Sequence, residues 1–200
     1  MLDNVIEDIK NIISSKLINF DINKLLYTIK ETSYSTSDKL YMTDKNNIVI
    51  NGDKLKEIYN GSGYCTDRLK ATDAIYIFKN NKIYLIEFKC GSIKKEEVYQ
   101  KMYDTYILLR DLEIITNLRF SLSNVHYILV YNKNKYTEKN NIHHNKITEN
   151  LKSKSNASFK NTTFFNINIF ENYIFKESFA CTEDDFNKFI IKEFEQEETI

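Results

Sequence analysis

The sequence contains no proline, no tryptophan and only four glycines among its 200 residues. Proline and glycine normally mark turns and helix ends, so their scarcity removes the usual markers of loops. Lysine, asparagine and isoleucine are abundant instead, a bias typical of an AT-rich coding genome, which makes lysine-rich stretches weak evidence of function. Hydrophobic residues make up 42% and aromatic residues 14% of the chain, which indicates a globular protein rather than a disordered one.

Cysteine is also scarce, and Cys65, Cys90 and Cys181 are odd in number and far apart. Because no Cys-x-x-Cys spacing occurs, neither a disulfide framework nor a cysteine-based zinc site is indicated. The chain has no apolar run of membrane-spanning length, and its first residues lack a basic segment followed by an apolar core. We therefore expect no membrane association and a reduced, cytoplasmic location.

The chain has no net charge, because 28 basic residues balance 28 acidic ones. This balance excludes the strongly basic footprint of many nucleic-acid-binding proteins. The charges are nevertheless segregated. Residues 131–160 carry seven lysines and two glutamates, whereas residues 176–200 carry three lysines and eight acidic residues. The basic segment is suited to face a polyanion.

Hydrophobic periodicity predicts the secondary structure. Helices are expected at residues 2–17, 21–31, 53–59, 92–112 and 184–198. Strands are expected at residues 48–50, 74–78, 83–88, 125–131 and 164–170. Residues 32–47 are expected to form a loop or a short strand, and residues 132–161 a long loop with a helical turn near 147–151. A hairpin followed by a helix and a further strand is typical of an α/β domain with a mixed central sheet.

The hairpin formed by residues 74–88 has charged residues at its open end. A turn closed at its two central asparagines places Asp73 roughly opposite Phe88, beside Glu87 and Lys89. Side chains two apart on a strand share a face, so Glu87 and Lys89 project together. Such charges are costly in an interior unless they bind something, and carboxylates suit a hard cation such as Mg²⁺ or Mn²⁺. The Phe88 carbonyl is the natural additional ligand.

These residues resemble the motif of the PD-(D/E)xK nuclease superfamily, which has the restriction-endonuclease-like fold. Asp73 matches the acidic residue that begins one strand, and Glu87-Phe88-Lys89 matches the acid-x-lysine triplet that ends the next. The gap of 14 residues between the two acids, the helix after Lys89 and the later buried strand agree with the family. The resemblance implies an α-β-β-β-α-β core with C-terminal additions.

On this resemblance, the whole chain, residues 1–200, forms a single nuclease-like domain. Its expected parts are N-terminal helices (2–31), the core (about 48–131), a basic loop (132–161) and a C-terminal strand with an acidic helix (162–200).

The resemblance also implies roles in phosphodiester hydrolysis. Asp73 would be the central ligand of Mg²⁺ (or Mn²⁺), and Glu87 with the Phe88 carbonyl would complete the metal site. Lys89 would orient or help to deprotonate the attacking water. Some branches of the superfamily place a glutamine on the following helix, which makes Gln100 a further catalytic candidate.

Many members of the superfamily add a metal-binding glutamate from the N-terminal helices. Glu31 is the preferred candidate for this position, and Glu7 and Glu57 remain open.

The function implied is that of a metal-dependent endonuclease, acting on DNA rather than RNA, as a homodimer or a subunit of a larger complex. Phage or plasmid defence, or a mobile element, would be its setting. A viral type of RNA endonuclease with the same core has a histidine in its N-terminal helices, where this chain has none. A glutamate such as Glu31 can occupy that place, so this alternative stays open. The alternative is a catalytically inactive binding or assembly protein that retained the fold, which the neutral charge and the acidic tail keep open.

Overall fold

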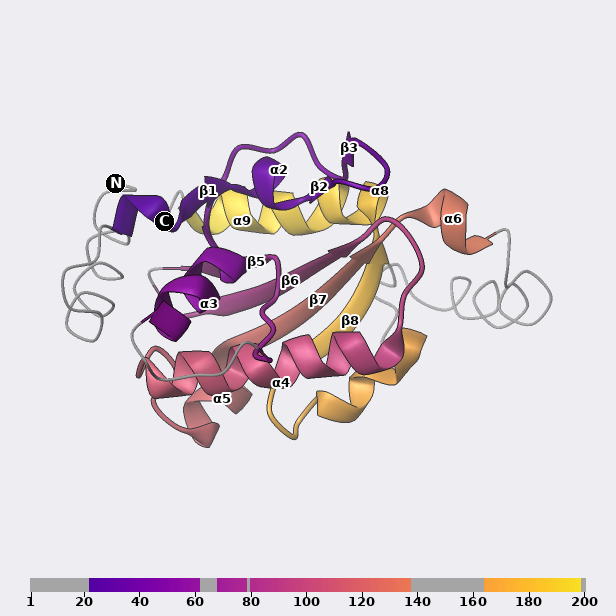
Figure 1. Ribbon diagram of the computed structural model, residues 1–200. Coiled ribbons are helices and arrows are strands. Elements are labelled where there is room, and N and C mark those ends of the chain that lie inside the picture. Colours follow the sequence, from indigo (N-terminus) through magenta and orange to yellow (C-terminus); the bar gives the residue numbers. More distant parts are fainter. Residues whose placement is uncertain (1–21, 62–67, 79, 138–163, 199–200) are drawn as a thin grey trace.

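The computed structural model describes residues 22–61, 68–78, 80–137 and 164–198. A mixed six-stranded sheet lies at its centre, with helices on both faces (Figure 1). The strands, in spatial order, are β1 (Leu26–Thr28), β4 (Ile48–Asn51), β5 (Ala74–Ile77), β6 (Ile83–Lys89), β7 (Val125–Tyr131) and β8 (Glu177–Thr182). Pairing is antiparallel from β1 to β6 and parallel from β6 to β8. The expected α/β class with a mixed, helix-flanked sheet is thus confirmed.

Each face of the sheet has its own hydrophobic core. One face is covered by α3 (Gly52–Gly61), α4 (Lys95–Asp111), α5 (Leu118–Asn124) and the 3-10 segment η2 (Phe164–Phe170). The other is covered by α2 (Ile29–Thr32) and the C-terminal segment made of α8 (Glu183–Asp185), the π-helical η3 (Phe186–Ile190) and α9 (Ile191–Glu198).

The remaining elements lie at the periphery of the sheet. They are the 3-10 turn η1 (Ile22–Lys24), the two-stranded ribbon of β2 (Tyr34–Ser35) and β3 (Leu40–Tyr41), and the short helix α6 (Lys133–Thr137). Within the described ranges, no helix combines the length and the hydrophobicity needed to cross a lipid bilayer.

The central strand β6 is apolar on both faces because both are covered by helices. Tyr84, Ile86 and Phe88 point into the core beneath α9, whereas Ile83 and Leu85 point into the core beneath α4. Glu87 continues this second series and is therefore a carboxylate placed in an otherwise apolar layer.

The structure confirms most elements of the central segment, with ends shifted by a few residues. These are the strands expected at 48–50, 74–78, 83–88 and 125–131 and the helices expected at 53–59, 92–112 and 184–198. The helix expected at 2–17, the turn near 147–151 and most of the basic loop lie outside the described residues.

Two predictions of secondary structure were wrong. Residues 21–31 do not form one helix, because β1 pairs with β4 and interrupts the helical pattern. Residues 164–170 form no strand, because Phe165 and Asn166 adopt left-handed backbone conformations with φ of 58° and 55°. Strand β8 and helix α5, which the sequence did not predict, complete the sheet edge and the lower helical layer.

The register of the hairpin also differs from the prediction. The hairpin closes between Phe78 and Lys82, where the Phe78 amide donates to the Lys82 carbonyl at 2.9 Å. Asn81 has a φ of 65°, as the longer hairpin loops require. Ala74 consequently pairs with Ile86, so Asp73 is in line with Glu87 rather than with Phe88.

Gly52 sets how closely α3 approaches the segment before β5. Its amide donates to the carbonyl of Asp73 at 3.3 Å. A Cβ atom on Gly52 would lie 1.9 Å from the carbonyl oxygen of Thr72. Only glycine therefore permits this contact.

We expect Gly52→Ala to destabilise the protein by about 2 kcal/mol, because backbone must move to accommodate the methyl group. Urea unfolding of the full chain measures this change. The matched control is Gly91→Ala, since a Cβ atom at Gly91 meets nothing within 4 Å. Equal stability of the two variants would contradict the close approach described here.

Candidate functional site

Asp73 stands directly before β5, at the end of the sheet where β6 also ends. The backbone amide of Phe88 donates to Asp73 Oδ2 at 2.7 Å, which fixes the aspartate against β6. Lys89 Nζ lies 2.9 Å from Glu87 Oε1. The structure thus brings together the three residues that the sequence singled out.

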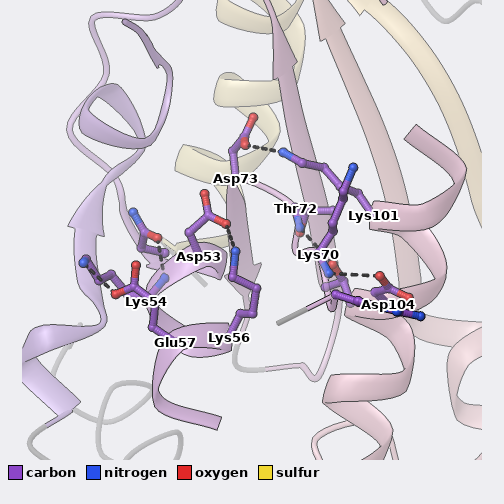
Figure 2. Close-up of polar contacts among 12 residues, drawn as sticks. Asp53, Lys54, Lys56, Glu57, Lys70, Thr72, Asp73, Lys101 and Asp104 are labelled. Carbon is purple, nitrogen blue, oxygen red and sulfur yellow. Dashed lines mark hydrogen bonds and ion pairs between the residues drawn. The ribbon is translucent and has the colours of Figure 1, made fainter. Parts of the chain in front are cut away.

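A fourth residue, Lys101 of α4, joins the two carboxylates. Its Nζ lies 2.9 Å from Asp73 Oδ1 and 2.8 Å from Glu87 Oε1. Figure 2 shows the contact between Asp73 and Lys101. Both carboxylates therefore converge on one cationic group, which marks a position suited to a positive charge.

Helix α4 also holds the chain that leads into Asp73. Asp104 accepts the amide of Lys70 at 2.9 Å, and the Thr105 hydroxyl accepts the amide of Thr72 at 2.9 Å (Figure 2). One helix thus fastens this segment at two alternate residues, and the position of Asp73 depends on α4 as much as on the sheet.

The Glu87 side chain is completely buried. Burial, and secondarily repulsion by Asp73, raises the pKa of Glu87 to about 7, although Lys101 and Lys89 oppose the shift. Burial lowers the pKa of Lys101, but attraction by Glu87 and Asp73 outweighs this effect and holds that pKa above its ordinary value. Lys101 therefore carries a full positive charge across the neutral range.

Tyr127 of β7 forms part of the floor beneath the carboxylates. It is fully buried, and its hydroxyl has no hydrogen-bond partner among the described residues. Burial raises the pKa of Tyr127 well above its usual value, and the charges of Glu87 and Asp73 raise it further. The Tyr127 hydroxyl therefore stays protonated across the neutral range.

A cleft of about 530 Å³ lies against the site. Asp73, Phe88 and Lys89 line it, together with Asp53 of α3 and Glu31 of α2. The rest of its wall is rich in hydroxyl groups. They come from Thr32, Ser33, Ser35, Thr36, Ser37 and Ser92. The cleft is thus polar and bordered by carboxylates and an ammonium group.

Glu31 lies in this cleft, but its carboxylate is engaged locally. It accepts the amide of Thr28 at 2.7 Å and the hydroxyl of Thr28 at 2.8 Å, which makes a capping box for α2. These bonds, the backbone one first, lower the pKa of Glu31. Glu31 therefore lines the cleft, but its hydrogen bonds go to Thr28 and not to Asp73 or Glu87.

The other candidates are not brought to the carboxylates. The amide of Gln100 donates to the carbonyl of Arg68 at 3.1 Å, so its contact supports the segment before Asp73. Glu57 is exposed on α3 and pairs with Lys54 at 2.8 Å. Glu7 lies outside the described residues.

The donor set fits a hard divalent cation only in part. In the described part of the chain, no group of three or more His, Cys, Asp or Glu side chains is arranged to hold a metal ion. Asp73 and Glu87 nevertheless reach one shared cationic group, which is the arrangement that two carboxylate ligands require. The amide and carbonyl of a strand residue project to the same edge, so we expect the Phe88 carbonyl to face the side where Asp73 lies.

Lys101 and Asp53 were missed at the level of sequence. Lys101 is spaced three and four residues from Val98 and Thr105, which are both buried, so helical periodicity placed a lysine on the buried stripe of α4. That conflict between charge and burial was the available signal. No comparable pattern marks Asp53, which reaches the cleft because α3 begins at Gly52.

Comparisons with models of known protein families, with curated proteins and with solved structures found no match to this chain.

The buried carboxylate of Glu87 should make stability depend on pH in metal-free buffer. Its pKa of about 7 lies above the ordinary value of 4.5, so the folded state binds more protons than the unfolded state between these values. Stability should therefore fall as the pH rises from about 5 to 7, by on the order of 3 kcal/mol, and then level off.

Urea unfolding at pH 5, 6, 7 and 8 measures this dependence. Glu87→Gln should flatten the profile, because the amide does not titrate. The matched control, Glu57→Gln on the exposed surface of α3, should keep the wild-type profile. Parallel profiles for wild type and Glu87→Gln would show that Glu87 is not the titrating group.

Proposed function

We propose that this protein is a metal-dependent nuclease with a restriction-endonuclease-like core, which hydrolyses phosphodiester bonds. The observation that carries the proposal is the convergence of Asp73 and Glu87 on a single cationic position beside Lys89. It is supported by the order of elements around the site, which is β4, α3, β5, β6, α4, α5 and β7. Without α3 and α5, this order is the strand-strand-strand-helix-strand succession of that core.

The chain's own residues would divide the work as follows. Asp73 and Glu87 hold the metal, and a bound Mg²⁺ or Mn²⁺ supplies Lewis acidity and an activated water. Lys89 borders both Glu87 and the cleft, where its ammonium orients that water and offsets negative charge on the phosphate. Tyr127 and the apolar layer around it keep bulk water from Glu87.

Lys101 has a positioning role in this scheme. It neutralises Asp73 and Glu87 when no metal is present and keeps both side chains aimed at the same point. Gln100 supports the segment before β5 through its hydrogen bond to the Arg68 carbonyl, and it does not touch the substrate in this scheme.

DNA remains the preferred substrate over RNA, and action as a homodimer or within a larger complex remains the preferred assembly. Both preferences, and a role in phage or plasmid defence or in a mobile element, rest on the resemblance of the motif.

A second function is favoured by Lys101 itself. Its ammonium satisfies both carboxylates without a metal, as expected of an inactive binding or assembly protein that retained the fold. The two functions differ in whether Lys101 yields its position to a divalent cation.

Cleavage assays test the nuclease directly. Plasmid DNA, single-stranded DNA and RNA serve as the substrate panel, and the wild type should cut DNA faster than RNA with Mg²⁺ or Mn²⁺ and should cut nothing with EDTA. Asp73→Ala and Lys89→Ala should each lower the rate about 100-fold or more, because each removes a metal ligand or a charge at the reacting phosphate. The control Lys192→Ala, on the exposed side of α9, should cut at the wild-type rate. Equal background from all proteins on every substrate would sink the proposal.

Calorimetric titration with Mn²⁺ separates the two functions without an activity measurement. Lys101→Gln removes the competing charge and should tighten Mn²⁺ binding roughly tenfold or more. Lys94→Gln is the matched control, since Lys94 is highly exposed at the N-cap of the same helix and its ion pair with Glu97 is long, at 3.9 Å. If neither the wild type nor Lys101→Gln binds Mn²⁺ at millimolar concentration, the inactive alternative is correct.

A further inference from the structure

Two tyrosines on the β2–β3 ribbon are exposed, and one of them, Tyr34, lines the cleft. Tyr34 and Tyr41 are directly paired across the ribbon. Their ring centroids lie 4.8 Å apart with the planes inclined by 45°. Even so, Tyr34 is 42% exposed and Tyr41 is 50% exposed. A cross-strand aromatic pair stabilises a ribbon, but that role does not require both rings to remain half in solvent.

The ribbon is continuous with the candidate site. Tyr34 itself lines the cleft that also contains Asp73 and Lys89. Hydroxyl side chains such as Ser35 and Ser92 line the same cleft, and hydroxyl groups are common donors to phosphate oxygens. A polymer strand lying in the cleft would therefore pass from the ribbon to the carboxylates.

A positive charge accompanies the aromatic pair. Lys30 Nζ lies 5.3 Å from the centroid of the Tyr41 ring. The ammonium lies over the Tyr41 ring, so the tyrosine pair and Lys30 together supply the two elements that single-stranded nucleic acid needs, an aromatic surface for the base and a cation for its phosphate. A paired base in a duplex keeps its faces against neighbouring base pairs and cannot use such a surface.

We propose that Tyr34 and Tyr41 form a stacking platform for an unpaired nucleobase, so that the cleft takes single-stranded nucleic acid or the unpaired end of a strand. This inference deepens the proposed nuclease function and rests on it for the path of the strand. The base is recognised by its π-face, so DNA and RNA share the chemistry of this site, and the choice between them is made by separate arms of the test.

The test uses full-length Asp73→Asn protein in buffer containing EDTA, so that no strand is cut. Binding of fluorescein-labelled 12-mers of deoxythymidine and of uridine, and of a 12-base-pair duplex, is followed by fluorescence anisotropy. Replacing both tyrosines, by Tyr34→Leu with Tyr41→Leu, should weaken single-strand binding about tenfold or more. Tyr34→Phe with Tyr41→Phe should retain it within about threefold, because the ring faces remain.

Tyr173→Leu is the matched control, because Tyr173 is 59% exposed but does not line the cleft. It should bind as the parent protein does, and thermal unfolding checks that every variant is folded. Unchanged binding of both single strands by the double leucine variant would overturn the platform, as would an equal loss on the duplex. A surface meant for a protein partner would give the first of these results.

The platform and the nuclease can fail separately. Normal cleavage by the wild type with unchanged binding by the leucine variant would remove the platform alone. A tenfold loss of binding together with no cleavage by the wild type would leave the platform and remove the nuclease. No binding of any oligonucleotide by any protein would overturn both.

Discussion

The burial of one carboxylate, Glu87, is the constraint from which the site follows. A charged group in the layer between β6 and α4 needs a counter-ion, and Lys101 supplies it from the helix. The same ammonium holds Asp73, so strand and helix are joined through one shared charge. The pKa of Glu87, raised to about 7 mainly by burial, shows how far this environment disfavours the ionised form. A protein that gained only stability from this place would do as well with an apolar side chain.

The surrounding fold serves this arrangement. Helix α4 aligns the segment before β5 through side-chain contacts to its backbone, and Gly52 allows α3 to approach the same segment. The cleft lies between α2, the β2–β3 ribbon, the start of α3 and the end of β6, so its carboxylates and Lys89 border the cleft while Glu87 stays buried. In the proposed nuclease, this separation of the buried Glu87 from the accessible Lys89 would let the substrate approach from one side while Glu87 is held fixed from the other.

The sequence predicted the local parts of this site well, and the long-range parts poorly. The strands of the hairpin, the long helix and β7 have strong periodic patterns, and the clustering of Asp73, Glu87 and Lys89 followed from them. The exact register of the hairpin could not be predicted from these patterns, because it depends on a loop conformation with positive φ at Asn81. Strand β1 forms because it pairs with β4, and the apolar pattern of its own residues indicated a helix instead. Segment η2 turns at two left-handed residues, and the apolar pattern of its residues indicated a strand instead. Lys101 was overlooked because a lysine in a helix is usually solvated, although its spacing among buried residues indicated otherwise.

The central claim is that Asp73 and Glu87 define one cation position, which Lys101 holds in the absence of metal. Anomalous diffraction from crystals soaked in Mn²⁺ tests it most directly, because it locates the metal and the lysine in one experiment. The account predicts a manganese peak within about 2.0–2.6 Å of oxygen atoms from both carboxylates, with Lys101 Nζ displaced from between them. The claim would be contradicted if manganese bound at full occupancy only elsewhere in the crystal and Lys101 still bridged Asp73 and Glu87.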